Sequence, residues 1–174
     1  MIPVLKKLII GYDRIPDYTL ARINSREAYE MPLIVNAISK PSIVSREQWG
    51  ARPPKNSYTN HSPREITIHH TWKPTAADYT GNQTIKNIQN YHMDTNGWSD
   101  IGYHFLVGTN PGTGATLIYQ GRPETVVGAH TGGHNTNNVG VNAIGDYTTE
   151  PLHANTYQNL IKLLAWICYT YKIS

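Results

Sequence analysis

The feature that most constrains this sequence is the alternation of strand-like and helix-like segments from residue 65 onward. Short runs rich in β-branched and apolar residues, typical of strands, lie at 65–69, 103–107, 116–119 and 139–144. Apolar residues recur at helical spacing over 82–94 and 155–172. Because strands and helices interleave, we predict an α/β fold with a central mixed β-sheet flanked by helices.

The first part of the chain differs from the rest. Its apolar run at 8–10 is short and follows two lysines, and no small-residue cleavage site comes after it, so it does not resemble a signal peptide. We interpret residues 1–42 as an N-terminal extension or linker and residues 43–174 as one domain. No apolar run reaches the roughly 18 residues of a membrane span, so none is predicted.

Composition excludes several classes of protein. The net charge is +3 and the basic residues are scattered, so the dense basic face of a nucleic-acid-binding domain is not expected. The chain has one cysteine, Cys168, which excludes an internal disulfide framework and a cysteine-rich zinc module. Because Cys168 lies within the amphipathic 155–172 segment, we expect a reduced core thiol.

Two adjacent histidines mark the first candidate site. His69 and His70 end a predicted strand, and sites in α/β sheets are built where strands end. Neutral imidazole is a good zinc ligand. Since neighbouring residues of a strand face opposite sides of the sheet, only one of the two would bind a metal. The alternative is that both are packed or hydrogen-bonded.

Two further segments carry polar side chains. The segment GAHTGGHN at 128–135 combines glycines, which permit close approach by a ligand, with hydrogen-bonding side chains, although it is also consistent with a simple glycine turn. In 103–107, a period of two places Tyr103 and Phe105 on one face and His104 on the other. A tyrosine near a metal can hydrogen-bond an attacking water or an oxyanion, whereas most strand tyrosines serve packing.

Six motifs occur in the order found in a known family, after an initial segment SREQWGAR at 45–52. They are ITIHHT at 66–71, WSDIGYHFLV at 98–107, IYQGR at 118–122, GAHTGGHN at 128–135, VGV at 139–141 and GDY at 145–147. Together they resemble the zinc-dependent N-acetylmuramoyl-L-alanine amidases of the type-2 amidase and peptidoglycan recognition protein family. The resemblance implies that family's α/β fold, and residues 1–42 have no counterpart in it.

The resemblance also implies an activity and a metal. These enzymes cleave the amide between the lactyl group of N-acetylmuramic acid and the L-alanine of the stem peptide, and zinc polarises the carbonyl and activates water. His69 matches the family's first zinc ligand, and Tyr103 matches its catalytic tyrosine. We therefore expect His69 to reach a groove at the carboxyl end of its strand, with Tyr103 within about one water of it.

A partner and a location follow from the same resemblance. His130 and Asn135 match positions that line the peptidoglycan groove. Arg122 and Trp98 are weaker substrate-binding candidates, and Trp98 alternatively caps the sheet. The expected partner is bacterial peptidoglycan, bound by a monomer that acts extracellularly or at the cell wall, as endolysin-like enzymes do.

Two departures from the family bear on catalysis. Asn142 stands where some members carry a glutamate base, and an amide cannot accept a proton at neutral pH, so tyrosine would serve instead. The family's other two zinc ligands follow the late helix, the first in a Gly-His-Arg-Asp-like motif, and the sequence to Ser174 lacks that motif. Cys168 is out of register with the third ligand. We therefore expect this chain to bind zinc weakly or not at all.

Three functions stay open on the sequence alone. The leading interpretation is an amidase domain, C-terminally incomplete, because non-catalytic members often replace the residue that matches His69. The alternative is a non-catalytic peptidoglycan recognition module. The third is an unrelated zinc hydrolase that uses His69, His130 and His134.

Overall fold

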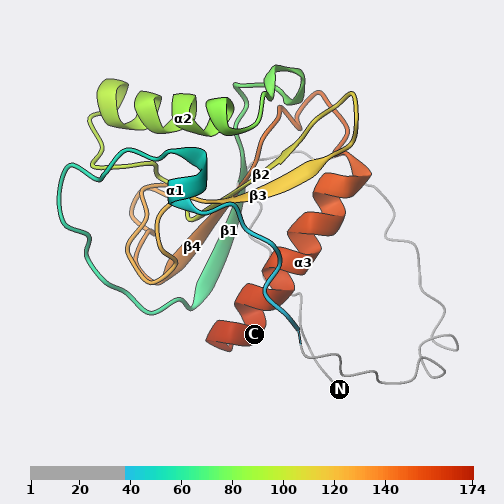
Figure 1. Cartoon of the computed structure of the whole chain (residues 1–174). Helices are drawn as coiled ribbons and strands as arrows, with labels where there is room; N and C mark the ends of the chain where they lie inside the picture. Colours follow the sequence, from blue (N-terminus) through green and yellow to red (C-terminus); the bar gives the residue numbers. More distant parts are fainter. Residues whose placement is uncertain (1–37) are drawn as a thin grey trace, which may run out of the picture.

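A four-stranded sheet forms the centre of the domain (Figure 1) in the computed structural model, which describes residues 38–174. Its strands are β1 (Glu65–His70), β2 (Phe105–Thr109), β3 (Thr116–Gln120) and β4 (Asn138–Ala143). The strand order is β1-β4-β2-β3, in which β1, β4 and β2 are parallel and β3 runs antiparallel to β2. The predicted mixed sheet is confirmed, and the predicted strands coincide with the observed ones except that β2 begins later.

One face of the sheet is covered by α3 (Ala154–Tyr171), the helix predicted at 155–172 (Figure 1). His153 begins it by accepting a hydrogen bond from the backbone N–H of Asn155 at 3.1 Å. The buried core on this side consists of Phe105, Val107, Ile118, Val139, Val141, Ala143, Leu160, Leu163, Trp166 and Ile167. Cys168 is a free, half-buried thiol on this helix, and burial raises its pKa.

The opposite face packs against α1 (Arg46–Trp49) and α2 (Asn82–Asn90), and α2 continues directly into a π-helical turn, η3 (Tyr91–Thr95). The helix predicted at 82–94 is therefore confirmed. A short 3-10 turn, η2 (Ala76–Asp78), lies between β1 and α2. Helices on both faces complete the predicted α/β architecture. Within residues 38–174, no helix is both long and apolar enough to cross a membrane.

The predicted extension at 1–42 lies outside the described residues except for 38–42. In this short part, the Lys40 ammonium lies 4.8 Å from the centre of the Trp166 ring on α3. Just after it, Val44 donates from its backbone N–H to the carbonyl of Ile118 in β3 at 2.8 Å. Lys40 therefore contacts α3, and Val44 contacts the sheet.

One prediction about side-chain direction is wrong. Strand β2 begins at Phe105, so the period of two does not extend back to Tyr103. Phe105 packs in the core under α3, whereas Tyr103 packs against the cluster under α2. The regular β2–β3 pairing begins at Phe105. Before it, the carbonyl groups of His104 and Tyr103 accept hydrogen bonds from the consecutive N–H groups of Gly121 and Arg122, at 2.8 and 2.9 Å, so the backbone does not keep the alternation of a regular strand.

Candidate functional site

The two adjacent histidines at the end of β1 face opposite sides of the sheet, as the period of a strand requires. His69 lies beside Tyr103 on the α2 side, with ring centroids 5.5 Å apart. His70 turns toward the α3 side, where its Nδ1 accepts a hydrogen bond from the backbone N–H of Tyr147 at 3.2 Å. One histidine of the pair is therefore placed beside Tyr103, and the other is not.

His130 approaches His69 from the loop at 128–135. The distance between His69 Nε2 and His130 Nδ1 is 3.1 Å. The side-chain oxygen of Asn135 accepts hydrogen bonds from the backbone N–H groups of His130 and Thr131, at 2.7 and 2.9 Å. Asn135 therefore holds the loop that carries His130, and its side-chain oxygen already accepts two hydrogen bonds from the protein's own backbone.

Burial keeps both imidazoles neutral at neutral pH. It lowers the pKa of His69, with a smaller contribution from His70, and it lowers the pKa of His130 to about 4. A neutral imidazole has the nitrogen lone pair that metal binding requires. His134 is exposed, and no group of three or more His, Cys, Asp or Glu side chains converges on a metal position within residues 38–174. An unrelated zinc hydrolase would use His69, His130 and His134. Of these three histidines, the structure brings together only His69 and His130.

Tyr103 places a phenol beside His69. Burial raises the pKa of Tyr103, and the nearby Asn142 amide offsets part of that effect. The phenol therefore keeps its proton at neutral pH and is a hydrogen-bond donor. Asn142 is the in-register neighbour of His69 on β4, and its fully buried side-chain nitrogen and oxygen make no well-formed hydrogen bond within the described part of the chain. Such buried, unsatisfied amides are uncommon, so this one marks a polar spot beneath the site.

A cavity of about 600 Å³ opens at Tyr103. Its walls come from the loop after β1 and from α2 with η3, and the lining residues are Thr71, Trp72, Lys73, Pro74, Asp78, Thr84, Asn87, Ile88, Tyr91, His92 and Tyr103. Two of them, Trp72 and Tyr91, are aromatic and largely exposed, at 63% and 58%. Apolar rings among a few polar groups suit a ligand of mixed character.

The two exposed aromatic residues of this cavity were not predicted from the sequence. Trp72 is the second residue after the end of β1, and a tryptophan just beyond the carboxyl end of a strand was an available signal. Tyr91 was hidden within a helical pattern, because exposure on a helix depends on what packs around it.

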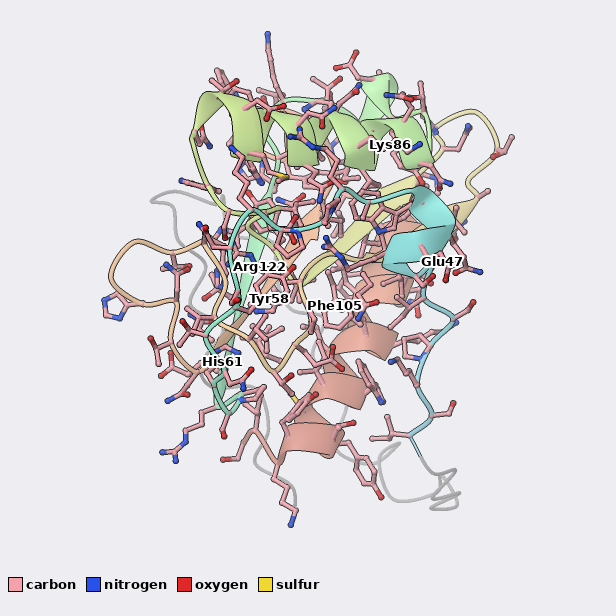
Figure 2. All side chains as sticks on the ribbon, turned by 60° about the vertical axis from the view of Figure 1, so that its left-hand side comes forward. Glu47, Tyr58, His61, Lys86, Phe105 and Arg122 are labelled. Carbon is pink, nitrogen blue, oxygen red and sulfur yellow. The ribbon has the colours of Figure 1, made fainter. Side chains whose placement is uncertain are left out.

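Trp98 and Arg122 lie behind the cavity wall. The Trp98 ring packs 4.7 Å from the ring of His92, which lines the cavity. Arg122 is 6% exposed, and its guanidinium donates to backbone carbonyl groups, the nearest being that of Ile101 at 2.7 Å. It lies in the interior beside Tyr58 (Figure 2). Trp98 is half-buried and Arg122 is buried, and neither side chain lines the cavity.

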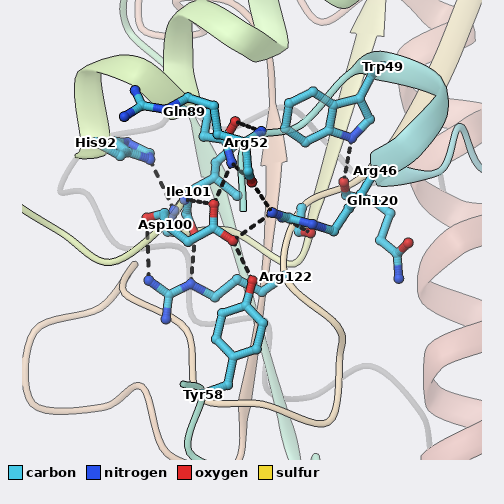
Figure 3. Close-up of polar contacts among 12 residues, drawn as sticks. Arg46, Trp49, Arg52, Tyr58, Gln89, His92, Asp100, Ile101, Gln120 and Arg122 are labelled. Atoms are coloured by element: carbon cyan, nitrogen blue, oxygen red, sulfur yellow. Dashed lines mark hydrogen bonds and ion pairs between the residues drawn. The ribbon is translucent and has the colours of Figure 1, made fainter. Parts of the chain in front are cut away.

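A buried carboxylate anchors the segment that carries Tyr103 (Figure 3). Asp100 is fully buried; it lies 3.0 Å from the Arg46 guanidinium and accepts hydrogen bonds from the side-chain amide of Gln89 at 2.6 Å and from the Tyr58 hydroxyl. These partners come from α1, from α2 and from the loop that precedes β1. A single carboxylate therefore ties three separate parts of the chain to the segment before β2.

His92 on the cavity wall makes stability depend on pH. It is 7% exposed; burial and, less strongly, Arg122 lower its pKa to about 4, while Asp100 opposes the shift. Its Nδ1 accepts a hydrogen bond from Gly102, which requires the neutral ring. The unfolded chain takes up this proton near pH 6.5 and the folded one does not, so the contribution is complete above that pH and is lost as the pH falls toward 4. We expect His92 to make the free energy of unfolding about 2 kcal/mol lower at pH 5 than at pH 7.5.

Urea denaturation at both pH values measures this difference. The matched variant His92→Asn retains an acceptor near the Nδ1 position but does not titrate. We expect the drop in unfolding free energy between the two pH values to shrink by about 2 kcal/mol in that variant. An identical drop in both proteins would contradict the assignment.

The fold and the site define an α/β domain with a histidine–tyrosine pair and a cavity near the carboxyl end of a parallel strand. Residues 59–174 match the family Amidase_2, described as N-acetylmuramoyl-L-alanine amidase, and the chain belongs to this family. The predicted family and fold class are thereby confirmed.

Curated relatives of the chain fall into two groups. The chain is 37% identical over 123 residues to Peptidoglycan-recognition protein SC2 of Drosophila melanogaster, covering 67% of this chain and 61% of that protein. It is 38% identical over 113 residues to human N-acetylmuramoyl-L-alanine amidase, covering 62% of this chain and 19% of that protein. The chain thus matches less than two thirds of the length of each of these curated relatives.

Solved structures show the same fold. The crystal structure of Drosophila peptidoglycan recognition protein SD superposes with a TM-score of 0.68 at 29% identity, covering 78% of each chain. A tyrosine-to-phenylalanine mutant of Drosophila PGRP-LB in complex with tracheal cytotoxin superposes with a TM-score of 0.64 at 31% identity, covering 79% of this chain and 80% of that one.

Proposed function

We propose that the complete protein containing this domain is a peptidoglycan amidase that cleaves between the lactyl group of N-acetylmuramic acid and the L-alanine of the stem peptide. The observation that carries the proposal is the pairing of His69 with Tyr103, because Tyr103 in turn lines the 600 Å³ cavity. Family membership and relatives named as this amidase support it.

His69 supplies one donor of the kind that the zinc ion of such chemistry uses. Its neutral imidazole is a good zinc ligand, but within residues 38–174 no group of three His, Cys, Asp or Glu side chains converges beside it, so the described residues supply only part of a catalytic ligand set. A bound zinc ion would polarise the scissile carbonyl and lower the pKa of a water molecule. In the proposal, His69 is the first of the protein's zinc ligands.

We assign the remaining roles in catalysis and substrate binding to other residues of the described domain. Tyr103, whose phenol stays protonated at neutral pH, donates a hydrogen bond to the carbonyl oxygen as negative charge develops on it. Asn142 cannot act as a base, so it contributes polarity beneath the site. Trp72 and Tyr91 pack against the ligand and hold its scissile amide near the reacting groups.

A second candidate function is peptidoglycan binding without hydrolysis. Several relatives are named peptidoglycan-recognition proteins, and residues 38–174 contain no cluster of three His, Cys, Asp or Glu ligands. In this case the cavity holds the ligand and the pairing of His69 with Tyr103 serves recognition. In both cases we propose a monomer that meets bacterial peptidoglycan extracellularly or at the cell wall.

Incubating the complete, zinc-loaded protein with purified peptidoglycan separates these functions. We expect new L-alanine amino termini and no new reducing sugar ends, because the site is aimed at an amide. Cleavage of a glycosidic bond would use paired carboxylates instead. New reducing ends without alanine termini would contradict the amidase, and binding without any cleavage would establish the recognition module.

A further inference from the structure

We propose that residues 27–35 of the N-terminal extension dock on the outer face of α3. This surface belongs to the side of the sheet opposite to Tyr103, so the docking does not depend on the proposed function. Three observations carry it: an apolar row that α3 presents to solvent, the place where the described chain meets α3, and the charges of the helix and of the segment.

The outer face of α3 carries a row of apolar side chains that are four residues apart, so they form one ridge along the helix. This α3 row consists of Tyr157, Ile161, Ala165 and Tyr169. Its three large members are exposed, Tyr157 to 52%, Ile161 to 42% and Tyr169 to 63%. The inner face of the same helix is already buried against the sheet. Because a helix that is apolar on both sides is normally buried on both, the α3 row indicates a second packing partner.

The described chain begins beside this helix (Figure 1). The Lys40 ammonium lies 4.8 Å from the centre of the Trp166 ring, and Ile43 packs against the core cluster under α3. At 3.6 residues per turn, Trp166 and Tyr169 point about 60° apart around the helix axis. Residues 1–37 therefore connect to the domain at the flank of α3 that adjoins the α3 row.

An apolar run lies close enough to this flank to reach the α3 row. The run, Leu-Ile-Val at 33–35, stands five to seven residues before Lys40. An extended chain covers roughly 3.3–3.6 Å per residue, so five residues span about 17 Å. The part of the row from Ile161 to Tyr169 is about 12 Å long at a rise of about 1.5 Å per residue. The run can therefore cover this part of the row.

The charges of the helix and of the segment are complementary. Within α3 the only charged residue is Lys162, and Lys172 follows at its C-cap; both are exposed. Glu27 and Glu30 come shortly before the apolar run. A docked segment would place these carboxylates beside the lysines, whereas a second copy packed through the same row would bring like charges together. The charges therefore favour the chain's own segment over a second copy as the partner.

Methyl NMR of the full 174-residue chain tests the docking. Nuclear Overhauser effects are expected between the methyl groups of the run at 33–35 and the side chains of Ile161 and Tyr169. A sample mixed from labelled and unlabelled chains distinguishes contacts within one chain from contacts between chains. Contacts within one chain would support the docking. Contacts only between chains, contacts of the α3 row with another part of the extension, or no contacts at all would overturn it.

Trypsin cleavage after Arg26 gives a second measurement, because this bond lies at the start of the docked segment. Removing one large apolar contact increases the undocked population, so the cleavage rate should rise at least about tenfold in Ile161→Asp and in Leu33→Asp. Leu117→Asp is the matched control: Leu117 is 44% exposed, close to the 42% of Ile161, but lies on β3, and its variant should be cleaved at the rate of the unmodified chain. An unchanged rate in Ile161→Asp, or equal acceleration in all three variants, would overturn the docking.

Discussion

Replacing His69 by alanine in the complete protein should reduce peptidoglycan hydrolysis by at least about 1,000-fold, because Lewis-acid stabilisation of the transition state is worth several kcal/mol. The variant loses the nitrogen that the proposal assigns to zinc, next to Tyr103. Replacing the adjacent His70 should leave the rate nearly unchanged, since its ring lies on the other face of the sheet and bonds to the backbone of Tyr147. Release of alanine amino termini at saturating zinc measures both rates.

His69 and His70 are adjacent residues of β1, so replacing either one should affect folding to a similar extent. Circular dichroism should give the same spectrum for both. Peptidoglycan binding should persist in His69→Ala, because the cavity walls around Trp72 and Tyr91 are unchanged. A rate for His69→Ala within about tenfold of the unmodified protein, or equal losses in both variants, would refute the assigned role of His69.

Asp100→Ala should lower the free energy of unfolding by about 3–5 kcal/mol, because removing one partner of a buried ion pair leaves the other charge and its hydrogen-bond donors unsatisfied. Arg46, the Tyr58 hydroxyl and the Gln89 amide would each lose their acceptor in the interior (Figure 3). The segment that carries Tyr103 would lose its anchor in the same step. Urea denaturation at neutral pH measures the change.

Asp94→Ala is the matched control for this prediction. Asp94 also pairs with an arginine, Arg52 at 2.6 Å, but the two side chains are 55% and 42% exposed. Exposed pairs of this kind contribute about 0–1 kcal/mol, since water solvates the separated charges well. Equal losses for Asp94→Ala and Asp100→Ala would show that burial of the Asp100 network does not determine its contribution.

The elements of the fold could be predicted from the sequence because their patterns are local. The apolar spacing of α3 and the β-branched run of β1 extend over neighbouring residues only, and both were identified. The start of β2 was not, because the irregular backbone pairing of Tyr103 and His104 with Gly121 and Arg122 depends on segments distant in the sequence. Trp98, Arg122, His130 and Asn135 were assigned to the substrate groove from motif matches, and none of them lines the observed cavity. Motif matching contains no information about burial, and Arg122 is buried.

By itself, the sequence determined the order of strands and helices, the family, and the fact that one histidine of the pair at the end of β1 would face each side of the sheet. The tertiary structure alone decided that His130, 61 residues along the chain, lies 3.1 Å from His69. It likewise decided that Asp100 is fully buried among side chains from three distant segments. The physical reason is that periodicity reports the geometry of one element, whereas these distances arise only when separate elements pack and exclude water together.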